Sequence, residues 1–344
     1  MNVGPQSGAG KECTVRESPS TGEAVGPPPP FDPELARALD LARPHIPTYR
    51  TLENIAEVRA AVRDSDIEDL TLGGTYDVVD LVIPGPVGAP GVSLVVCRPV
   101  RAEEPRPALY YMHGGGMISG DARKGLADMV RLASTVGAAV VSVEYRLAPE
   151  TPHPGPVEDC FSGLTWVYAH GSELGIDPHR LIVGGKSAGG GLAAATTLLA
   201  RDRGGPEVIG QLLLCPMLDD RNDSLSAVQM EGQGVWDRAD NLTGWTALLG
   251  SSRGRDDVSP YAAPARAVDL SGLPPTFIEV GSAETFRDEN VRFASRIWQA
   301  GGPCELHVWP GGFHGFDSVA PEATLSKDAV VARRQWLKRV VSAA

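Results

Sequence analysis

Short apolar runs and amphipathic stretches alternate along most of the chain. Eight runs rich in branched apolar residues have the length of β-strands, and they span residues 78–83, 92–97, 108–112, 138–145, 180–183, 209–215, 276–280 and 305–309. Helical periodicity separates the later runs, near residues 122–135, 157–170, 190–203, 287–300 and 325–342. Short apolar strands that alternate with helices are typical of a mainly parallel sheet covered on both faces. The pattern therefore predicts an α/β fold with an eight-stranded sheet, whose first two strands form an antiparallel edge.

Three segments lie outside this alternation. Residues 1–30 hold almost no large apolar side chains and end in GPPPP, which predicts a disordered leader. Residues 31–43 and 52–63 have the pattern of two amphipathic helices. Residues 221–263 carry tryptophans and leucines but no convincing strand, which indicates a helical insertion between two strands of the sheet.

The place of this insertion suggests a role for it. Open α/β sheets bind their ligands at the carboxyl edge, and the insertion is expected above that edge. The two N-terminal helices can join it as a lid. We expect residues 31–344 to form a single domain with a helical cap from about 31–65 and about 221–263. An ordinary peripheral helical layer is the alternative.

Composition narrows the class of protein. At 344 residues and 42% hydrophobic side chains, the chain can bury a large core. Its 31 basic and 43 acidic residues give a net charge of −12, which argues against nucleic-acid or anionic-membrane partners because these need basic patches. The five scattered cysteines fit buried free thiols in a reducing cytoplasm. No apolar run approaches the roughly 18 residues of a membrane span. A homodimer is compatible with this composition.

The stretch Gly185-Lys186-Ser187-Ala188-Gly189 allows two incompatible interpretations. A phosphate-binding loop would need a glycine five positions before the Gly-Lys pair, but residue 180 is arginine and residues 181–183 look like strand. A nucleophile elbow needs a buried strand, a turn flanked by glycines and then a helix. The serine of such a turn has a strained backbone, and a Cβ at either flanking glycine would collide with the neighbouring backbone. The surrounding pattern favours the elbow, with Ser187 as the nucleophile.

A nucleophilic serine needs a base and an acid that orients the base. In α/β-hydrolases these follow the serine in the order acid, then histidine. His314 lies in a glycine-rich loop after the last predicted strand, where a base is expected. Two candidate acids follow the seventh predicted strand. We favour Glu284, which is closer to the strand end, over Asp288, which can simply complement a helix N-terminus.

Three glycines follow the third predicted strand in the sequence His113-Gly114-Gly115-Gly116. Glycines at a strand end let backbone N–H groups point into a site without side chains in the way. Together with the N–H group of Ala188, these donors can bind the oxyanion that develops in acyl transfer. His113 precedes the loop, so we interpret it as a structural residue rather than a base.

Five motifs in this order resemble the hormone-sensitive-lipase-like carboxylesterases of the α/β-hydrolase superfamily. They are HGGG at 113–116, EYRLAPE at 144–150, GKSAGG at 185–190, GSAETFRDE at 281–289 and GGFHGF at 311–316. The likeness runs from about residue 76 to the C-terminus. It implies Ser187 as nucleophile, His314 as base and Glu284 at the acid position. It also implies oxyanion N–H groups from Gly115, Gly116 and Ala188, with Gly114 supporting the loop.

Two residues depart from the family pattern. The family usually has an aspartate before the nucleophile, where this chain has Lys186, and an aspartate as the acid, where it has Glu284. A glutamate can orient an imidazole from one methylene farther back. Lys186 puts a positive charge beside the site, which changes the local salt bridges, and we expect it to point away from the substrate.

The sequence thus predicts a serine carboxylesterase for small esters of short to medium acyl chains. Met117, Ile118, Trp236 and Trp245 are the expected pocket walls. No cofactor is expected, and no metal site either, since the seven histidines show no H-x-x-x-H or H-E-x-x-H spacing. Within the same fold, an amidase, deacetylase or lactone hydrolase on the same triad is the alternative enzyme. A small-molecule receptor without catalysis is the alternative of another class.

Overall fold

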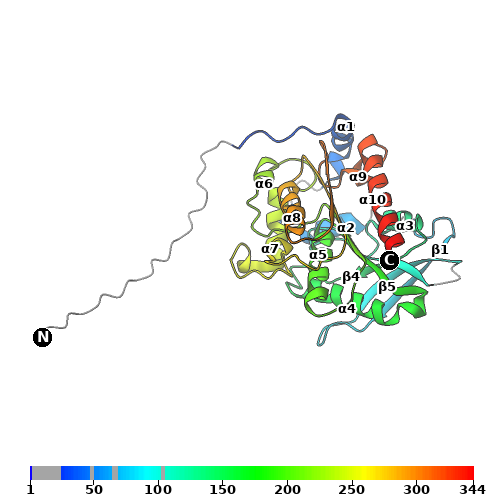
Figure 1. Cartoon of the computed structure of the whole chain (residues 1–344). Coiled ribbons are helices and arrows are strands. Elements are labelled where there is room, and N and C mark those ends of the chain that lie inside the picture. The colour runs from blue at the N-terminus through cyan, green and yellow to red at the C-terminus, as the bar shows by residue number, and fades with distance from the viewer. Residues whose placement is uncertain (2–24, 47–49, 64–68, 102–104) are drawn as a thin grey trace.

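The computed structural model describes residues 1, 25–46, 50–63, 69–101 and 105–344 (Figure 1). All eight predicted strands form and join one sheet. Their bounds lie within a few residues of the predicted ones: β1 (Tyr76–Ile83), β2 (Val92–Pro99), β3 (Arg106–Met112), β4 (Ala139–Glu144), β5 (Ile176–Lys186), β6 (Gly210–Leu214), β7 (Thr276–Gly281) and β8 (Cys304–Trp309). The mainly parallel α/β sheet expected from the alternating pattern is confirmed.

The strands lie in the order β1-β2-β4-β3-β5-β6-β7-β8. β1 pairs antiparallel with β2, and β2 pairs antiparallel with β4. All the other neighbours pair parallel. The predicted antiparallel edge is therefore confirmed, and the carboxyl ends of β3, β5, β6, β7 and β8 meet at one edge of the sheet.

Helices cover both faces of this sheet, which explains why almost every residue of the central strands β3, β4, β6 and β7 is buried. One core contains side chains of α4 (Gly155–His170), α5 (Ala188–Asp202) and α8 (Arg287–Gln299). The opposite core contains side chains of α3 (Leu126–Ser134) and α10 (Thr324–Ala343). Successive residues of β3 alternate between the two, with Tyr110 in the first core and Tyr111 in the second. This alternation is the two-residue period of a strand that is buried on both sides.

The segments outside the alternation are largely helical. α1 (Pro33–Ala42), η1 (Arg43–His45) and α2 (Ile55–Arg63) precede the sheet. α6 (Leu225–Gln229), α7 (Arg238–Leu249) and η3 (Gly250–Ser252) occupy the insertion, and residues 221–263 contain no strand. The remaining short elements are η2 (Gly171–Leu174), η4 (Pro264–Arg266) and α9 (Phe316–Val319). Most of the predicted leader, and residues 47–49, 64 and 65 of the predicted cap, lie outside the described residues.

The two segments predicted to form a cap contact the sheet edge and each other. α1 lies beside α9 (Figure 1), and its buried Leu35 and Leu39 pack with Phe313. From the segment before α2, the Arg50 guanidinium pairs with Asp240 of α7 at 2.7 Å. α7 in turn approaches the glycine loop after β3, since a Cβ on Gly244 would lie 2.9 Å from the carbonyl oxygen of Gly116. Within the described part of the chain, no helix is long and apolar enough to cross a membrane.

Candidate active site

β5 runs directly into Ser187, which precedes the first residue of α5. Ser187 has φ 59° and ψ −121°, a conformation that costs an L-residue free energy and persists only when its surroundings hold it. A Cβ at Gly185 would lie 2.2 Å from the carbonyl oxygen of Gly189, and one at Gly189 would lie 2.0 Å from that of Met112. The strand, turn and helix required by the elbow interpretation are all present, and the strand leaves no room for a phosphate-binding loop.

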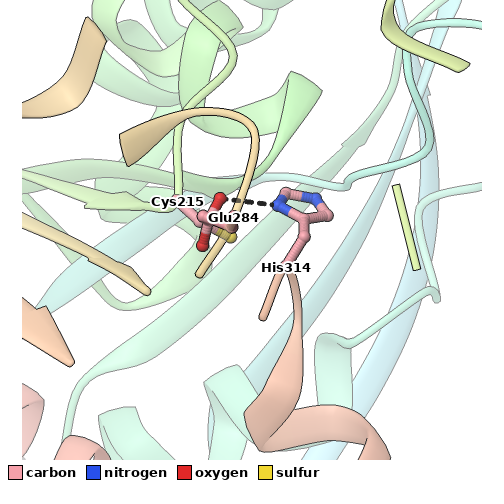
Figure 2. Close-up of side chains that lie close together, drawn as sticks. All are labelled: Cys215, Glu284 and His314. Carbon is pink, nitrogen blue, oxygen red and sulfur yellow. Dashed lines mark hydrogen bonds and ion pairs between the residues drawn. The ribbon is translucent and has the colours of Figure 1, made fainter. Parts of the chain in front are cut away.

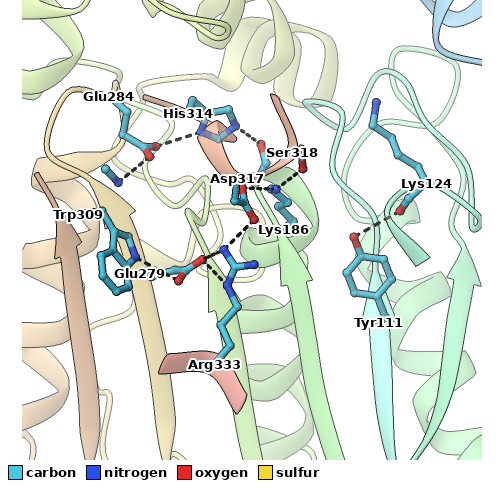
Figure 3. Close-up of polar contacts among 12 residues, drawn as sticks. Tyr111, Lys124, Lys186, Glu279, Glu284, Trp309, His314, Asp317, Ser318 and Arg333 are labelled. Carbon is cyan, nitrogen blue, oxygen red and sulfur yellow. Dashed lines mark hydrogen bonds and ion pairs between the residues drawn. The ribbon is translucent and has the colours of Figure 1, made fainter. Parts of the chain in front are cut away.

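Three side chains from different strand ends form one hydrogen-bonded chain. Figure 3 shows the contact between Glu284 and His314. The Oγ atom of Ser187 lies 2.9 Å from Nε2 of His314, and Nδ1 of His314 lies 3.0 Å from Oε1 of Glu284. The backbone N–H of Gly281 donates to the other carboxylate oxygen of Glu284 at 2.9 Å. Ser187 follows β5, Glu284 follows β7 and His314 follows β8, so the parallel sheet itself brings the three residues together.

Asp288, the alternative acid, lies in the first turn of α8. One of its carboxylate oxygens accepts a hydrogen bond from the backbone N–H of Ser226 at 2.8 Å, and the other pairs with Arg287. Its contacts thus tie α8 to α6. The structure brings Glu284, and not Asp288, to His314.

Cys215 adds a third group beside the pair of Glu284 and His314 (Figure 2). The Sγ atom, one carboxylate oxygen and one imidazole nitrogen of these three buried residues lie within 4.8 Å of one another, so they are the donor set that could hold a metal ion among the described residues. Because His314 and Glu284 already bond to each other, their geometry suits proton transfer without an ion. Burial disfavours the imidazolium form of His314, but Cys215 and Glu284 favour it and raise the pKa of His314 above its ordinary value.

The glycine loop after β3 lies next to the elbow. A Cβ on Gly114 would lie 3.3 Å from the Cβ of Ser187. Gly115 and Gly116 have φ of 130° and 64°, and their N–H groups donate to no acceptor among the described residues. Ala188 is the first residue of α5, where helical N–H groups lack an intrahelical partner. Unpaired N–H groups beside a serine are the arrangement that an oxyanion requires.

His113 stands behind this loop and is fully buried. Its ring stacks on Tyr145 with centroids 4.2 Å apart, and the hydroxyl of Tyr145 donates to the carbonyl oxygen of His113. Burial lowers the pKa of His113 to about 4, so the ring is neutral at ordinary pH. These contacts fit the structural role expected from the sequence.

A cleft of about 1020 Å³ opens onto Ser187 and His314. Its lining includes Gly114, Gly115, Gly116 and, of the four predicted wall residues, Trp236. Met117, Ile118 and Trp245 are 0% exposed and belong to the core on the α5 face of the sheet. The structure therefore does not bring these three into the cleft lining. Their apolar character reflects core packing, which a sequence pattern cannot distinguish from a pocket wall.

Sequence reasoning missed two features of the site. Cys215 directly follows β6, and its position at the carboxyl end of a parallel strand was the available signal. The second feature is a row of largely buried charges next to the triad, which begins at Lys186 (Figure 3). Lys186, Asp317 and Arg333 of this row also belong to the cleft lining. The signal for this row was a glutamate, Glu279, inside the otherwise apolar strand β7.

Comparison with known proteins places this site in a family. A family model described as the alpha/beta hydrolase fold matches residues 109–318, which hold the glycine loop and all three triad positions. The chain belongs to this family. Its relatives also support the hormone-sensitive-lipase-like resemblance and identify the chain as a carboxylic ester hydrolase.

The similarity to individual family members extends over nearly the whole chain. Esterase LipI of Mycobacterium tuberculosis is 34% identical over 89% of this chain and 95% of its own length. Carboxylesterase NlhH of the same organism is 32% identical over 92% of this chain and 98% of its own length. Among solved structures, a bacterial heroin esterase matches with a TM-score of 0.84 and 39% identity, over 90% of this chain and 98% of that chain.

Proposed function

We propose that this protein is a serine carboxylesterase that hydrolyses short- to medium-chain esters through an acyl-enzyme. The continuous hydrogen-bonded chain from Ser187 through His314 to Glu284 carries the proposal. Ser187 is the nucleophile, His314 is the base and then the acid, and Glu284 orients the imidazole. The N–H groups of Gly115, Gly116 and Ala188 hold the oxyanion, and Gly114 lets the loop approach the elbow.

The reaction has two halves that use the same groups. In the first, Oγ of Ser187 bonds to the ester carbonyl carbon while Nε2 of His314 takes the hydroxyl proton. The C–O bond to the alcohol then breaks, and the alcohol leaves with that proton. In the second half, water attacks the acyl carbon and gives a proton to Nε2, and Oγ of Ser187 recovers it as the carboxylic acid leaves. The imidazolium formed in each half is paired with Glu284.

The preference for short to medium acyl chains rests on the cleft. Trp236 packs directly against the glycine loop after β3, since a Cβ on Gly116 would lie 2.2 Å from the Trp236 ring. That contact limits the room beside the ester carbonyl. The guanidinium of Arg50 lies over the Trp236 ring, 5.1 Å from its centroid, and restrains the ring from the other segment of the proposed cap.

The proposed cap consists of about residues 31–65 and about residues 221–263, within a single domain of residues 31–344. Removing residues 1–30 should leave melting temperature and activity unchanged, because described residues 25–30 are largely exposed. Removing residues 1–59 should lower both, since it deletes the buried Leu35 and Leu39 and the hydrogen bond from Arg59 to the carbonyl oxygen of Ile118. Equal behaviour of the two truncations would contradict the cap.

Hydrolysis of p-nitrophenyl esters with acyl chains from C2 to C12 tests the proposed activity. We expect turnover by the wild type that declines at the long end, and none above background for Ser187→Ala. Matched anilide and lactone substrates separate an ester hydrolase from an amidase or lactonase. Binding of esters without turnover would favour a receptor. The cytoplasmic location and the homodimer are separate predictions, for cell fractionation and sedimentation.

A further inference from the structure

Four charged side chains form a row beneath the triad (Figure 3). The Nζ atom of Lys186 lies 2.7 Å from Oδ1 of Asp317, and the other carboxylate oxygen of Asp317 lies 2.7 Å from the guanidinium of Arg333. Arg333 also pairs with Glu279, whose second carboxylate oxygen accepts from the indole N–H of Trp309 at 3.2 Å. The signs alternate, so the row carries no net charge.

The row joins the three chain segments that hold the triad. Lys186 is the residue before Ser187. Asp317 lies three residues after His314, and Glu279 lies five residues before Glu284. Arg333 of α10 pairs with both Glu279 and Asp317 and so connects these two acids. The ion pair between Lys186 and Asp317 therefore links the residue before the nucleophile to the segment that follows the base.

The side chains of this row are shielded from water. Their exposed fractions are 19% for Lys186, 10% for Asp317, 6% for Arg333 and 5% for Glu279. Burial alone would raise the pKa of Asp317, but Lys186 and Arg333 outweigh it and hold that pKa well below its usual range. Water and salt screen the attraction between two such shielded charges only weakly, so the pair favours one geometry. In an exposed pair the attraction is screened and the side chains keep more freedom.

Buried ion pairs often contribute little net stability compared with apolar replacements, because desolvation offsets their attraction. Their geometry, however, is restrictive, and a displacement of about 1 Å between reacting groups can cost about 100-fold in rate. We propose that Lys186 and Asp317 are positioning residues, which hold the Ser187 turn and the His314 loop in register so that Oγ and Nε2 stay within hydrogen-bond reach. This inference rests on the proposed serine-esterase function.

The same geometry accounts for a lysine, rather than an acidic residue, at position 186. An aspartate at position 186 would face the carboxylate of Asp317 in a buried place. In this chain the positive charge of the elbow matches the negative charge of the loop after His314. The two positions therefore have to be changed together to keep the contact.

The test compares full-length variants by steady-state hydrolysis of p-nitrophenyl acetate, with active sites counted by phosphonate titration. Lys186→Met should lower kcat per titrated site by about 10- to 100-fold with little change in KM. Lys186→Arg should restore most of the loss, because it keeps the charge. The double variant Lys186→Met/Asp317→Asn leaves no unpaired charge, so it should fold, yet it should keep the low kcat.

Arg266→Met is the matched control. Arg266 pairs with Asp220 at 2.7 Å with exposed fractions of 11% and 0%, but it joins segments that carry none of the triad residues. It should lower the melting temperature and leave kcat per titrated site unchanged. A wild-type kcat per site in both Lys186→Met and the double variant would overturn the positioning role, as would a change confined to KM. Absence of turnover by the wild type would instead overturn the proposed function itself.

Discussion

The strand ends that carry the triad and the walls of the cleft above them are held in different ways. Ser187, Glu284 and His314 each follow a parallel strand, and hydrogen bonds of 2.9 to 3.0 Å connect them to one another and to the backbone. Trp236 instead comes from the insertion, and its ring is held by Arg50, 186 positions earlier in the sequence, through a contact of 5.1 Å. The sheet thus sets the geometry of these three side chains, whereas the place of Trp236 in the cleft depends on packing between distant segments. Changes to the two regions should therefore have different kinetic signatures.

The largest effect is expected at the acid. Glu284→Gln should lower kcat by about 10⁴-fold with the fold intact, because the imidazole loses the partner that fixes its tautomer. Asp288→Asn is the matched control, four residues away. It should keep nearly full activity and lose roughly 0.3–1 kcal/mol in the free energy of unfolding, as expected for a charge at a helix N-terminus. Purified variants compared by steady-state kinetics and urea unfolding provide the test. The reverse ranking of the two would remove Glu284 from the site.

Gly116 lies where the two regions touch. Gly116→Ala should lower kcat/KM by about 10²-fold, because the new Cβ would meet the Trp236 ring at 2.2 Å and displace an oxyanion donor. Gly232→Ala offers a control with a similarly positive φ of 73° and open space around the position. It should cost stability alone. Equal kcat/KM values for the two alanine variants would show that Gly116 is needed only for its backbone conformation.

Trp236 tests the wall of the cleft. Trp236→Ala should change kcat/KM for p-nitrophenyl acetate by no more than about ten-fold and move the preferred acyl chain to greater length. Trp245→Ala should leave the chain-length profile unchanged and cost about 3–5 kcal/mol in the free energy of unfolding, since that side chain is fully buried in the core. If Trp245→Ala alters the profile and Trp236→Ala does not, our assignment of the wall is wrong.

The smallest effect is a shift of the pH profile. His314 must be neutral to accept the proton of Ser187, and Glu284 is one of the groups that raise its pKa. Glu284→Gln should lower the pKa of His314 and so move the acidic limb of the kcat/KM profile to lower pH. The residual hydrolysis of an activated ester by this variant, measured from pH 5 to 9, gives the position of the acidic limb. Asp288→Asn should leave the limb in place, and an upward shift in Glu284→Gln would contradict the pairing.

Sequence patterns predicted the eight strands and the strand, turn and helix around Ser187 because each depends on local order along the chain. They also favoured Glu284 over Asp288, and Glu284 is the acid that contacts His314. A buried strand followed by a glycine-flanked serine has few structural outcomes, and the sheet then determines which strand ends meet. Met117, Ile118 and Trp245 were expected in the pocket but lie in the core, because an apolar side chain looks the same in both places. The contact of Lys186 with Asp317 joins positions 131 residues apart, and no local pattern indicates which charges meet in space.

The rate at which a fluorescent phosphonate labels the protein measures activation of the nucleophile without reference to any particular ester. Peptide mass spectrometry then locates the label. We expect a single label on Ser187 in the wild type and in Asp288→Asn at similar rates, slower labelling of the same serine in Glu284→Gln, and none in Ser187→Ala. Label on another serine, or an unchanged labelling rate in Glu284→Gln, would contradict the claim that Ser187, His314 and Glu284 act as one unit.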